Sequence, residues 1–451
     1  MQNSASSRLP PTLVIAAPAS GSGKTVLTLA LLRHFRNQGT AVGSFKVGPD
    51  YIDPTFHSAA GGRSCRNIDG WAMRPQTRSA ALARAGADCE LVIGEGVMGL
   101  FDGAPDGTGS TADLAAELGV PVILVVDVKG QAASAVAVIE GFARHRDDVG
   151  IAGVIFNRVG GGGHRQTLIE ACAPTGIPLL GFVPRDERLV LPERHLGLVQ
   201  ATEHSDLGVR LDAAAEIIAE HVDTAHLQSL AGSPAQSDTD PSRPLPPLGQ
   251  RIAVADDAAF AFFYRSVLEG WQAAGAEILP FSPLADEAPA ADCDAVYLPG
   301  GYPELHAEAL ANGENFLPGL RQAAAGGAFL FGECGGYMVL GQSLTDADGT
   351  AHAMAGLLPL ETSFAMRKLH LGYRRVTTLG ETPFGKPGSV LKGHEFHYTQ
   401  ILGEDHAACA ALFSVTDARG EKIGKAGLQA ANVAGSFVHL VDCADQASSK
   451  R

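Results

Sequence analysis

Short apolar runs recur through the first 200 residues, and each is followed by glycine, proline or a polar residue. The clearest are Leu13–Ala17, Ala41–Val47, Leu91–Ile93, Val120–Val126, Ile151–Phe156 and Leu179–Val183. Apart from Ala41–Val47, which contains Ser44 and Lys46, these runs show no polar alternation, which predicts strands buried on both faces, as in a parallel sheet. Helical patterns separate them, for example at Val26–Phe35 and Thr111–Leu118. Strands that alternate with helices predict an α/β fold with a doubly wound, mainly parallel sheet.

The pattern breaks at residues 230–249, where five prolines stand among Ser, Asp and Thr. Such a composition cannot build a core and predicts a semi-rigid linker. We therefore expect one domain over residues 1–229 and another over 250–451. The second domain again opens on a strand, Arg251–Ala255, followed by a helix near Phe260–Ala274, and is also expected to be α/β.

Composition narrows the functional classes. The chain has 451 residues, a formal net charge of −15 and a pI of about 5.4. This charge disfavours binding to nucleic acid. No apolar run approaches the roughly 18 residues of a membrane span, and no signal peptide is evident. The seven cysteines form no C-x-x-C pair, so free thiols in a cytoplasmic protein are expected.

The first strand leads into a phosphate-binding loop. Its predicted nucleotide-binding residues are Ser20, Gly21, Ser22, Gly23, Lys24 and Thr25. Glycines let backbone N–H groups turn toward a phosphate, and the following helix adds its N-terminal dipole. Lys24 is expected to reach the outer phosphates and Thr25 to hold Mg²⁺. Pro18 departs from the usual pattern, which has its first glycine there.

Polar residues stand at the ends of the next strands. Lys46 lies near the end of the second strand, Asp50 follows that strand, and Glu95 ends the strand that begins at Leu91. In an open parallel sheet these ends face the ligand crevice, so Asp50 and Glu95 are candidate Mg²⁺ ligands beside Thr25. Lys46 could reach a phosphate or carboxylate. An Asp-Pro turn is the plainer interpretation of the Asp50 segment.

Three further residues follow the same logic. Asp102 lies seven residues beyond Glu95 and is expected over the same crevice. Asp127 ends another strand, as support for the site or as a helix cap. Asn157 ends the next strand, where P-loop proteins often contact the nucleotide base.

The second domain contains a nucleophile elbow, Gly332-Glu-Cys334-Gly-Gly336, between an apolar strand and a helix. The glycines relieve crowding at a strained turn. We expect the helix N-terminus to lower the pKa of the Cys334 thiol. A double glycine, Gly300-Gly301, ends the preceding strand.

A cysteine nucleophile needs a histidine. His439, after a short strand near the end of the domain, is the preferred candidate, with His394 and His397 as rivals. The His-Glu-x-His spacing at 394–397 lacks the i, i+4 spacing of helical zinc motifs, so a metal site there is not favoured.

Several segments together resemble one family. They are Ala19–Thr25, Lys46–Asp53, Glu95–Asp102, Leu191–Leu198, Gly300–Glu304, Gly332–Gly336 and Gly393–His397. Across nearly the whole chain these segments resemble glutamine-dependent cobyrinate (or hydrogenobyrinate) a,c-diamide synthases of cobalamin biosynthesis. The first half is similar to dethiobiotin synthetases and the second to class I glutamine amidotransferases. The usual triad has a Glu two residues after its His, but here that position is Val441.

The resemblance implies a carbon–nitrogen ligase that uses ATP, Mg²⁺, L-glutamine and a corrinoid substrate. It implies that Cys334 and His439 hydrolyse glutamine, with the oxyanion held near Gly301 and Gly335. Acetate side chains a and c would be activated as acyl phosphates, with Lys46, Tyr51 and Asp102 facing the substrate. It does not decide between cobalt-containing and metal-free substrate or the order of amidation, and it leaves a homodimer open.

Three alternatives remain at this stage. Cobyric acid synthase and nickel-sirohydrochlorin a,c-diamide synthase share both domains, although the Asp50 and Asp102 segments favour the cobyrinate type. A P-loop switch ATPase of the partitioning type belongs to a different class. The complete elbow and the lack of a membrane-targeting amphipathic tail count against it.

Overall fold

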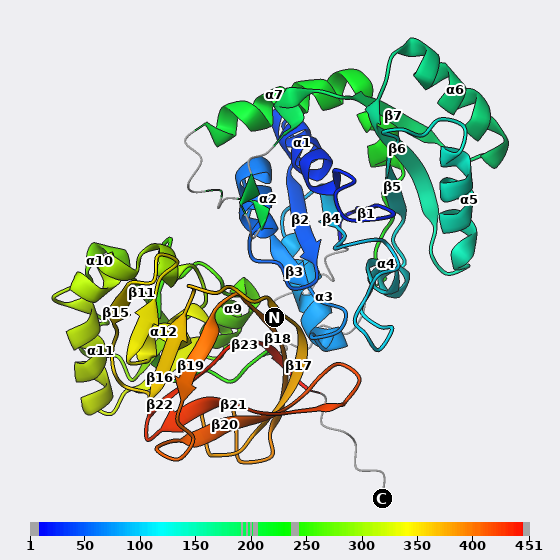
Figure 1. Cartoon of the computed structure of the whole chain (residues 1–451). Coiled ribbons are helices and arrows are strands. Elements are labelled where there is room, and N and C mark those ends of the chain that lie inside the picture. Colours follow the sequence, from blue (N-terminus) through cyan, green and yellow to red (C-terminus); the bar gives the residue numbers. More distant parts are fainter. Residues whose placement is uncertain are drawn as a thin grey trace, which may run out of the picture. The chain divides into compact units, whose positions relative to one another are not determined.

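The computed structural model describes residues 9–190, 193–194, 197–198, 201, 206–235 and 243–444. The chain divides into two compact units (Figure 1). The first comprises residues up to 71 and 78–240. The second comprises residues 241–451 together with the short segment 72–77. The motif at 191–198, assigned above to the family resemblance, lies largely outside the described residues.

The first unit is built on a parallel seven-stranded sheet in the order β3-β2-β4-β1-β5-β6-β7. Its strands are β1 (Thr12–Ala16), β2 (Val42–Val47), β3 (Arg66–Ile68), β4 (Leu91–Glu95), β5 (Val122–Asp127), β6 (Ile151–Val159) and β7 (Leu179–Pro184). Its helices are α1 (Lys24–Asn37), α2 (Asp53–Gly61), α3 (Pro75–Ala85), which begins in segment 72–77, α4 (Thr111–Leu118), α5 (Ala135–His145), α6 (Gly162–Cys172), α7 (Leu207–His221) and α8 (Thr224–Ser229). A short hairpin pairs β8 (Glu193–Arg194) with β9 (Gly197–Leu198).

Helices cover both faces of this sheet (Figure 1). Side chains of β1 alternate between two apolar clusters. Leu13 and Ile15 pack with residues of α1, α2 and α7, whereas Val14 and Ala16 pack with residues of α3 to α6. Burial on both faces is the reason that these strands lack polar alternation. The predicted doubly wound α/β fold is therefore confirmed.

The second unit contains a mixed ten-stranded sheet in the order β11-β10-β12-β13-β22-β21-β20-β17-β18-β23, and β14, β15, β16 and β19 form a smaller sheet. The strands are β10 (Arg251–Ala255), β11 (Glu277–Phe281), β12 (Ala295–Leu298), β13 (Phe329–Glu333), β14 (Ser343–Thr345), β15 (Ala351–Ala353), β16 (Leu360–Ser363), β17 (His370–Thr378), β18 (Val390–His397), β19 (Gln400–Glu404), β20 (Ala410–Thr416), β21 (Lys422–Ala430), β22 (Val433–Ser436) and β23 (Val438–Cys443). The helices are α9 (Arg265–Ala273), α10 (Ala307–Asn312), α11 (Phe316–Ala325) and α12 (Gly335–Leu340). The α/β core expected for this half is present, and α9 begins five residues later than the sequence pattern predicts.

Much of the predicted linker packs against one unit or the other. Gly232 pairs with Thr12 beside β1, and the Ala235 N–H donates to the Leu118 carbonyl. On the other side Leu245 and Leu248 are buried. The remainder, residues 236–242, lies outside the described residues.

All seven cysteines are free thiols, as the sequence predicts. Among the helices that the structure describes, none is long and apolar enough to cross a membrane.

Candidate active sites

The phosphate-binding loop links β1 to α1. Gly21 and Gly23 adopt left-handed backbone conformations with φ of 75° and 92°. A Cβ on Gly23 would lie 2.2 Å from the Asn157 amide nitrogen, so only glycine fits. The same amide donates to the Ser22 carbonyl at 2.9 Å, and Arg158 donates to the Gly21 carbonyl at 3.2 Å. Residues at the end of β6 therefore hold the loop in shape.

Lys24 and Thr25 open α1 as the sequence predicts, and both are tied to β4 or the loop beyond it. Lys24 Nζ donates to the Met98 carbonyl at 2.5 Å and to the Ala19 carbonyl at 3.3 Å. Thr25 Oγ1 lies 2.5 Å from Glu95 Oε1 and 3.2 Å from Asp53 Oδ2. The loop thus brings a hydroxyl, two carboxylates and an ammonium group together.

Lys46 completes this cluster from β2. Its Nζ lies 2.5 Å from Asp53 Oδ2 and 2.7 Å from Glu95 Oε1. Glu95 is fully buried, and its other oxygen lies 2.6 Å from His57 Nε2. The predicted substrate role of Lys46 stays a prediction, but the structure places its ammonium group against the carboxylates.

The charges in the cluster are strongly coupled. Burial by itself would raise the pKa of Glu95, but Lys46 and His57 hold that pKa well below its usual range. Burial and the neighbouring Asp50 raise the pKa of Asp53. Burial lowers the pKa of Lys24. Of the two carboxylates, Glu95 and Asp53, Glu95 is therefore the one that stays ionised.

Asp53 and His57 are site residues to which the sequence analysis gave no role. Asp50, one of the predicted metal ligands, accepts the backbone N–H groups of Ile52 and Asp53, at 2.9 and 3.0 Å, just before α2, and its role as a ligand stays a prediction. These hydrogen bonds place Asp53, the first residue of α2, toward Thr25. The Asp-x-x-Asp spacing before Pro54 was the available signal, because an Asp preceding a helix commonly caps it.

The structure also places the remaining predicted residues of the first unit. Asp102 accepts the Gly99 N–H at 2.9 Å in the loop after β4. Tyr51 is buried and Ser20 is exposed. Asp127 pairs with Arg158 at 2.6 Å and accepts the Lys129 N–H, so it acts as a local structural support. The predicted contact of Asn157 with a base stays a prediction, since its amide is engaged by the loop.

The donors around Thr25 suit a hard divalent cation. Thr25, Asp53 and Glu95 offer one hydroxyl and two carboxylates within hydrogen-bonding distance of one another or of Lys46 Nζ. Mg²⁺ prefers such oxygen ligands and is usually held by one or two carboxylates together with phosphate oxygens. The residues present therefore fit this ion.

In the second unit Cys334 stands at the sharp turn between β13 and α12. Its φ of 49° is left-handed, which is rare for a residue with a side chain and marks a strained turn. A Cβ on Gly336 would lie 1.9 Å from the Leu298 carbonyl oxygen, and one on Gly332 would lie 2.6 Å from the Gly336 backbone. The glycines of the elbow are thus required by close backbone approach.

His439 lies in β23 directly opposite His394 of β18, and their rings stack with centroids 5.1 Å apart. His394 Nε2 in turn lies 2.7 Å from the Tyr264 hydroxyl. A Cβ on Gly300 would lie 2.4 Å from His439 Cε1, so this ring rests on the double-glycine loop. These contacts orient His439 although Val441 supplies no carboxylate.

Glu333, the residue before Cys334, is hydrogen-bonded to β23, the strand of His439. Its Oε1 accepts the Leu440 N–H at 2.9 Å, and its Oε2 accepts the Tyr297 hydroxyl at 2.7 Å. The Cys334 N–H donates to the Ser436 carbonyl at 2.9 Å. Buried hydrogen bonds therefore connect the elbow to β23, which carries His439, and to the neighbouring strand β22.

The expected lowering of the Cys334 pKa is wrong. Burial of the side chain, with the nearby Glu304 carboxylate, raises the pKa of the thiol, and one hydrogen bond from the Gly335 N–H does not compensate. Burial also lowers the pKa of His439 far below its usual value. Both side chains are therefore neutral at rest, Cys334 as a thiol and His439 as an imidazole.

The two predicted oxyanion donors are adjacent. A Cβ on Gly335 would lie 3.1 Å from the Gly301 nitrogen. Backbone groups of the double-glycine loop and of the elbow thus meet beside Cys334.

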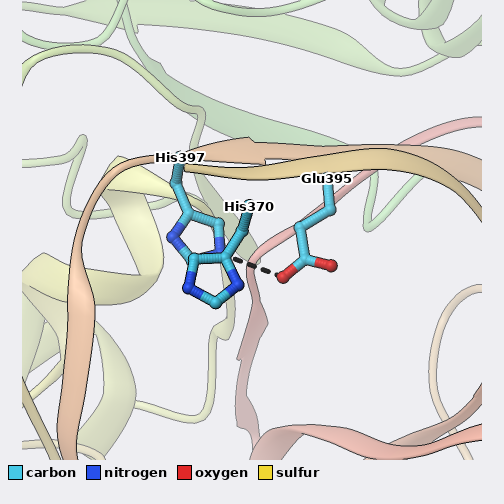
Figure 2. A group of neighbouring side chains, drawn as sticks. All are labelled: His370, Glu395 and His397. Carbon is cyan, nitrogen blue, oxygen red and sulfur yellow. Dashed lines mark hydrogen bonds and ion pairs between the residues drawn. The ribbon is translucent and has the colours of Figure 1, made fainter. Parts of the chain in front are cut away.

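The rival histidine His397 clusters with His370 and Glu395 (Figure 2). It stands three residues beyond His394 in β18, so the two side chains project from opposite faces of the strand. Its ring stacks on His370 at 4.6 Å and on Phe437 at 4.1 Å. Its Nε2 lies 2.9 Å from Glu395, whose second oxygen accepts Arg374 Nε at 2.8 Å. Donor atoms of His370, Glu395 and His397 lie within 4.8 Å of one another, but the Arg374 cation already balances the carboxylate.

Two protein-family models match the chain. Residues 13–199 match the CobQ/CobB/MinD/ParA nucleotide binding domain. Residues 251–446 match the CobB/CobQ-like glutamine amidotransferase domain. Fold, sites and family models define an amidotransferase that carries a P-loop nucleotide-binding domain.

Relatives similar over their whole length narrow the class further. Proteins named hydrogenobyrinate a,c-diamide synthase from Brucella abortus and Rhizobium meliloti are each 54% identical, over 96% and 95% of this chain and 99% of theirs. The protein of that name from Rhodobacter capsulatus is 52% identical over 96% of this chain and 99% of its own. This chain belongs to the hydrogenobyrinate a,c-diamide synthase family.

Proposed function

We propose that this protein is a carbon–nitrogen ligase that amidates the a and c acetate side chains of hydrogenobyrinate, with glutamine as nitrogen donor and ATP as energy source. One observation carries the reaction type: a single chain holds both a P-loop with a carboxylate cluster and a cysteine elbow with an oriented histidine. The name of the relatives supports the metal-free macrocycle over cobyrinate. Cobyric acid synthase and nickel-sirohydrochlorin a,c-diamide synthase, which share both domains, are the alternative activities.

In the glutaminase reaction, Cys334 attacks the side-chain amide of glutamine as His439 accepts the thiol proton. His439 then delivers this proton to the departing ammonia. Backbone N–H groups of Gly301 and Gly335 stabilise the oxyanion, a contribution of about 3–4 kcal/mol for each donor. Water attacks the thioester and releases glutamate.

In the synthetase reaction, a substrate carboxylate attacks the γ-phosphate of ATP, giving an acyl phosphate and ADP. Lys24 stabilises the charge on the phosphoryl oxygens. Ammonia then displaces phosphate and leaves the amide. Thr25, Asp53 and Glu95 would hold Mg²⁺, which when bound neutralises phosphate charge. Asp50, a metal candidate from the sequence, positions Asp53 in this scheme.

Substrate contacts are assigned on the same basis. Lys46 neutralises the Asp53 and Glu95 carboxylates before the nucleotide binds. After binding, its ammonium group is free to contact a phosphate or the substrate. Tyr51 and Asp102 face the macrocycle. Dependence on free ATP and glutamine supports a cytoplasmic location, and a homodimer is compatible with this scheme.

The test follows amide formation on hydrogenobyrinate by mass spectrometry, with either glutamine or ammonium chloride as nitrogen source. Cys334→Ala should abolish synthesis from glutamine and retain synthesis from ammonium chloride. Cys409→Ala, at a half-buried thiol outside the site, is the matched control. If Cys334→Ala lost both activities while Cys409→Ala kept them, the assignment of the two activities to separate sites would be refuted. If the wild type used cobyrinate in preference to hydrogenobyrinate, the assignment of the metal-free substrate would be refuted.

A further inference from the structure

Glu304 lies in the turn that follows the double glycine, within the single 3₁₀ turn Pro303–Leu305. Its Oε2 is buried, and among the residues that the structure describes it has no hydrogen-bond partner. A buried carboxylate oxygen without a partner costs free energy, and such a group calls for an explanation by strain, an ordered water, an ion or a ligand.

The turn packs against Gly335, the residue that follows Cys334. A Cβ on Gly335 would lie 2.9 Å from the Pro303 ring, one residue from Glu304. Of the carboxylates that raise the Cys334 pKa, Glu304 acts most strongly, ahead of Glu333 and Glu395. The Glu304 carboxylate therefore belongs to the immediate surroundings of the reacting thiol.

The other two carboxylates near the thiol are already satisfied. Glu333 accepts hydrogen bonds on both oxygens, and Glu395 is shared between His397 and Arg374. Arg367, the cation that acts on Glu304, is exposed and does so only through its charge. Burial raises the pKa of Glu304 to about 7. Glu304 is thus an acid with one oxygen left for a cationic donor.

We propose that Glu304 binds the α-ammonium group of glutamine and so selects the free amino acid as nitrogen donor. This proposal rests on the glutaminase function proposed above. The reacting amide of glutamine lies at the end of a short side chain, so its ammonium group must lie near the nucleophile when the amide reaches Cys334. The Glu304 carboxylate would contact this ammonium group, which other primary amides lack.

The discriminating experiment compares two nitrogen donors. Glutamine carries the ammonium group, whereas 5-amino-5-oxopentanoate has the same amide and carboxylate without it. Glu304→Gln should lower kcat/KM for glutamine about 10- to 100-fold, the effect expected from loss of a charge-assisted hydrogen bond. For 5-amino-5-oxopentanoate the variant should be no slower than the wild type. Glu308→Gln, an exposed glutamate one turn along, is the matched control.

Alkylation provides a readout that does not need turnover. A diazoketone analogue of glutamine that keeps the amino acid head should label Cys334 about 10- to 100-fold more slowly in Glu304→Gln. Iodoacetamide, which has no such head, should label it at least as fast as in the wild type. Peptide mapping distinguishes Cys334 from the other thiols.

Two results would overturn the assignment. Equal loss with both donors would show that Glu304 only maintains the fold of the turn, and unchanged kcat/KM for glutamine would show that it does not touch the ammonium group. Failure of the proposed function is a separate outcome, because wild-type protein would then show no glutaminase activity at all.

Discussion

Glu333 offers a quantitative test of how the glutaminase site is held together. Its carboxyl group is almost fully buried and accepts two hydrogen bonds, from the Tyr297 hydroxyl and the Leu440 N–H. Leu440 directly follows His439. We therefore expect Glu333→Ala to destabilise the second unit and to lower glutaminase activity, and Glu333→Gln to preserve both largely.

The magnitudes follow from the contacts. Alanine would leave two buried donors unsatisfied at about 1–3 kcal/mol each, or roughly 2–6 kcal/mol together. Glutamine keeps an acceptor for Leu440 and should cost about 1 kcal/mol at a pH where Glu333 is neutral. Burial raises the pKa of Glu333 from 4.5 to about 7. This difference is worth about 3 kcal/mol of unfolding free energy.

The sign of the pH dependence is fixed by the direction of this shift. The folded state holds the proton more tightly than the unfolded state, so the contribution is fully present below pH 4.5 and is lost as the pH rises toward about 7. Glutamine does not titrate. Relative to Glu333→Gln, the wild type should therefore lose about 3 kcal/mol of stability between pH 4.5 and 8.

Trp271 provides the assay. Its ring lies edge-on against Tyr297 with centroids 5.4 Å apart, and Trp71 is the second tryptophan of the chain. In a Trp71→Phe background, urea unfolding followed by fluorescence reports on the second unit alone. A stability difference between wild type and Glu333→Gln that does not vary from pH 4.5 to 8 would refute the account of a buried, titrating Glu333.

Three further outcomes are expected. Lys24→Ala should reduce amide synthesis from both glutamine and ammonium chloride at least about 100-fold, because it removes stabilisation of transferred phosphate; retained synthesis from ammonium chloride would contradict the P-loop role. Asp53→Asn should raise the Mg²⁺ concentration needed for half-maximal synthesis about tenfold or more. Asp50→Asn should change it little, because asparagine also accepts the two backbone N–H groups, and the reverse order would restore Asp50 as the ligand. His394→Leu should lower glutaminase kcat about tenfold and leave ammonia-dependent synthesis intact, which parallel assays of the two activities would check.

The sequence by itself determined the features that depend on local chain geometry. Apolar runs identified the buried strands because both faces of a parallel sheet are covered. The glycines around Lys24 and Cys334 identified the two tight turns, since only residues without a side chain fit the close backbone contacts at Gly23 and Gly336.

Only the tertiary structure decided which of several similar side chains meet. Asp50 and Asp53 are both carboxylates of one short segment, but at the start of α2 Asp50 accepts backbone N–H groups whereas Asp53 lies beside Thr25. The stacking of His394 on His439 depends on the register of β18 and β23, strands more than 40 residues apart. The Cys334 pKa depends on burial by distant segments, which outweighs the local effect of a six-residue helix. Such effects come from packing between remote parts of the chain, and no local pattern encodes them.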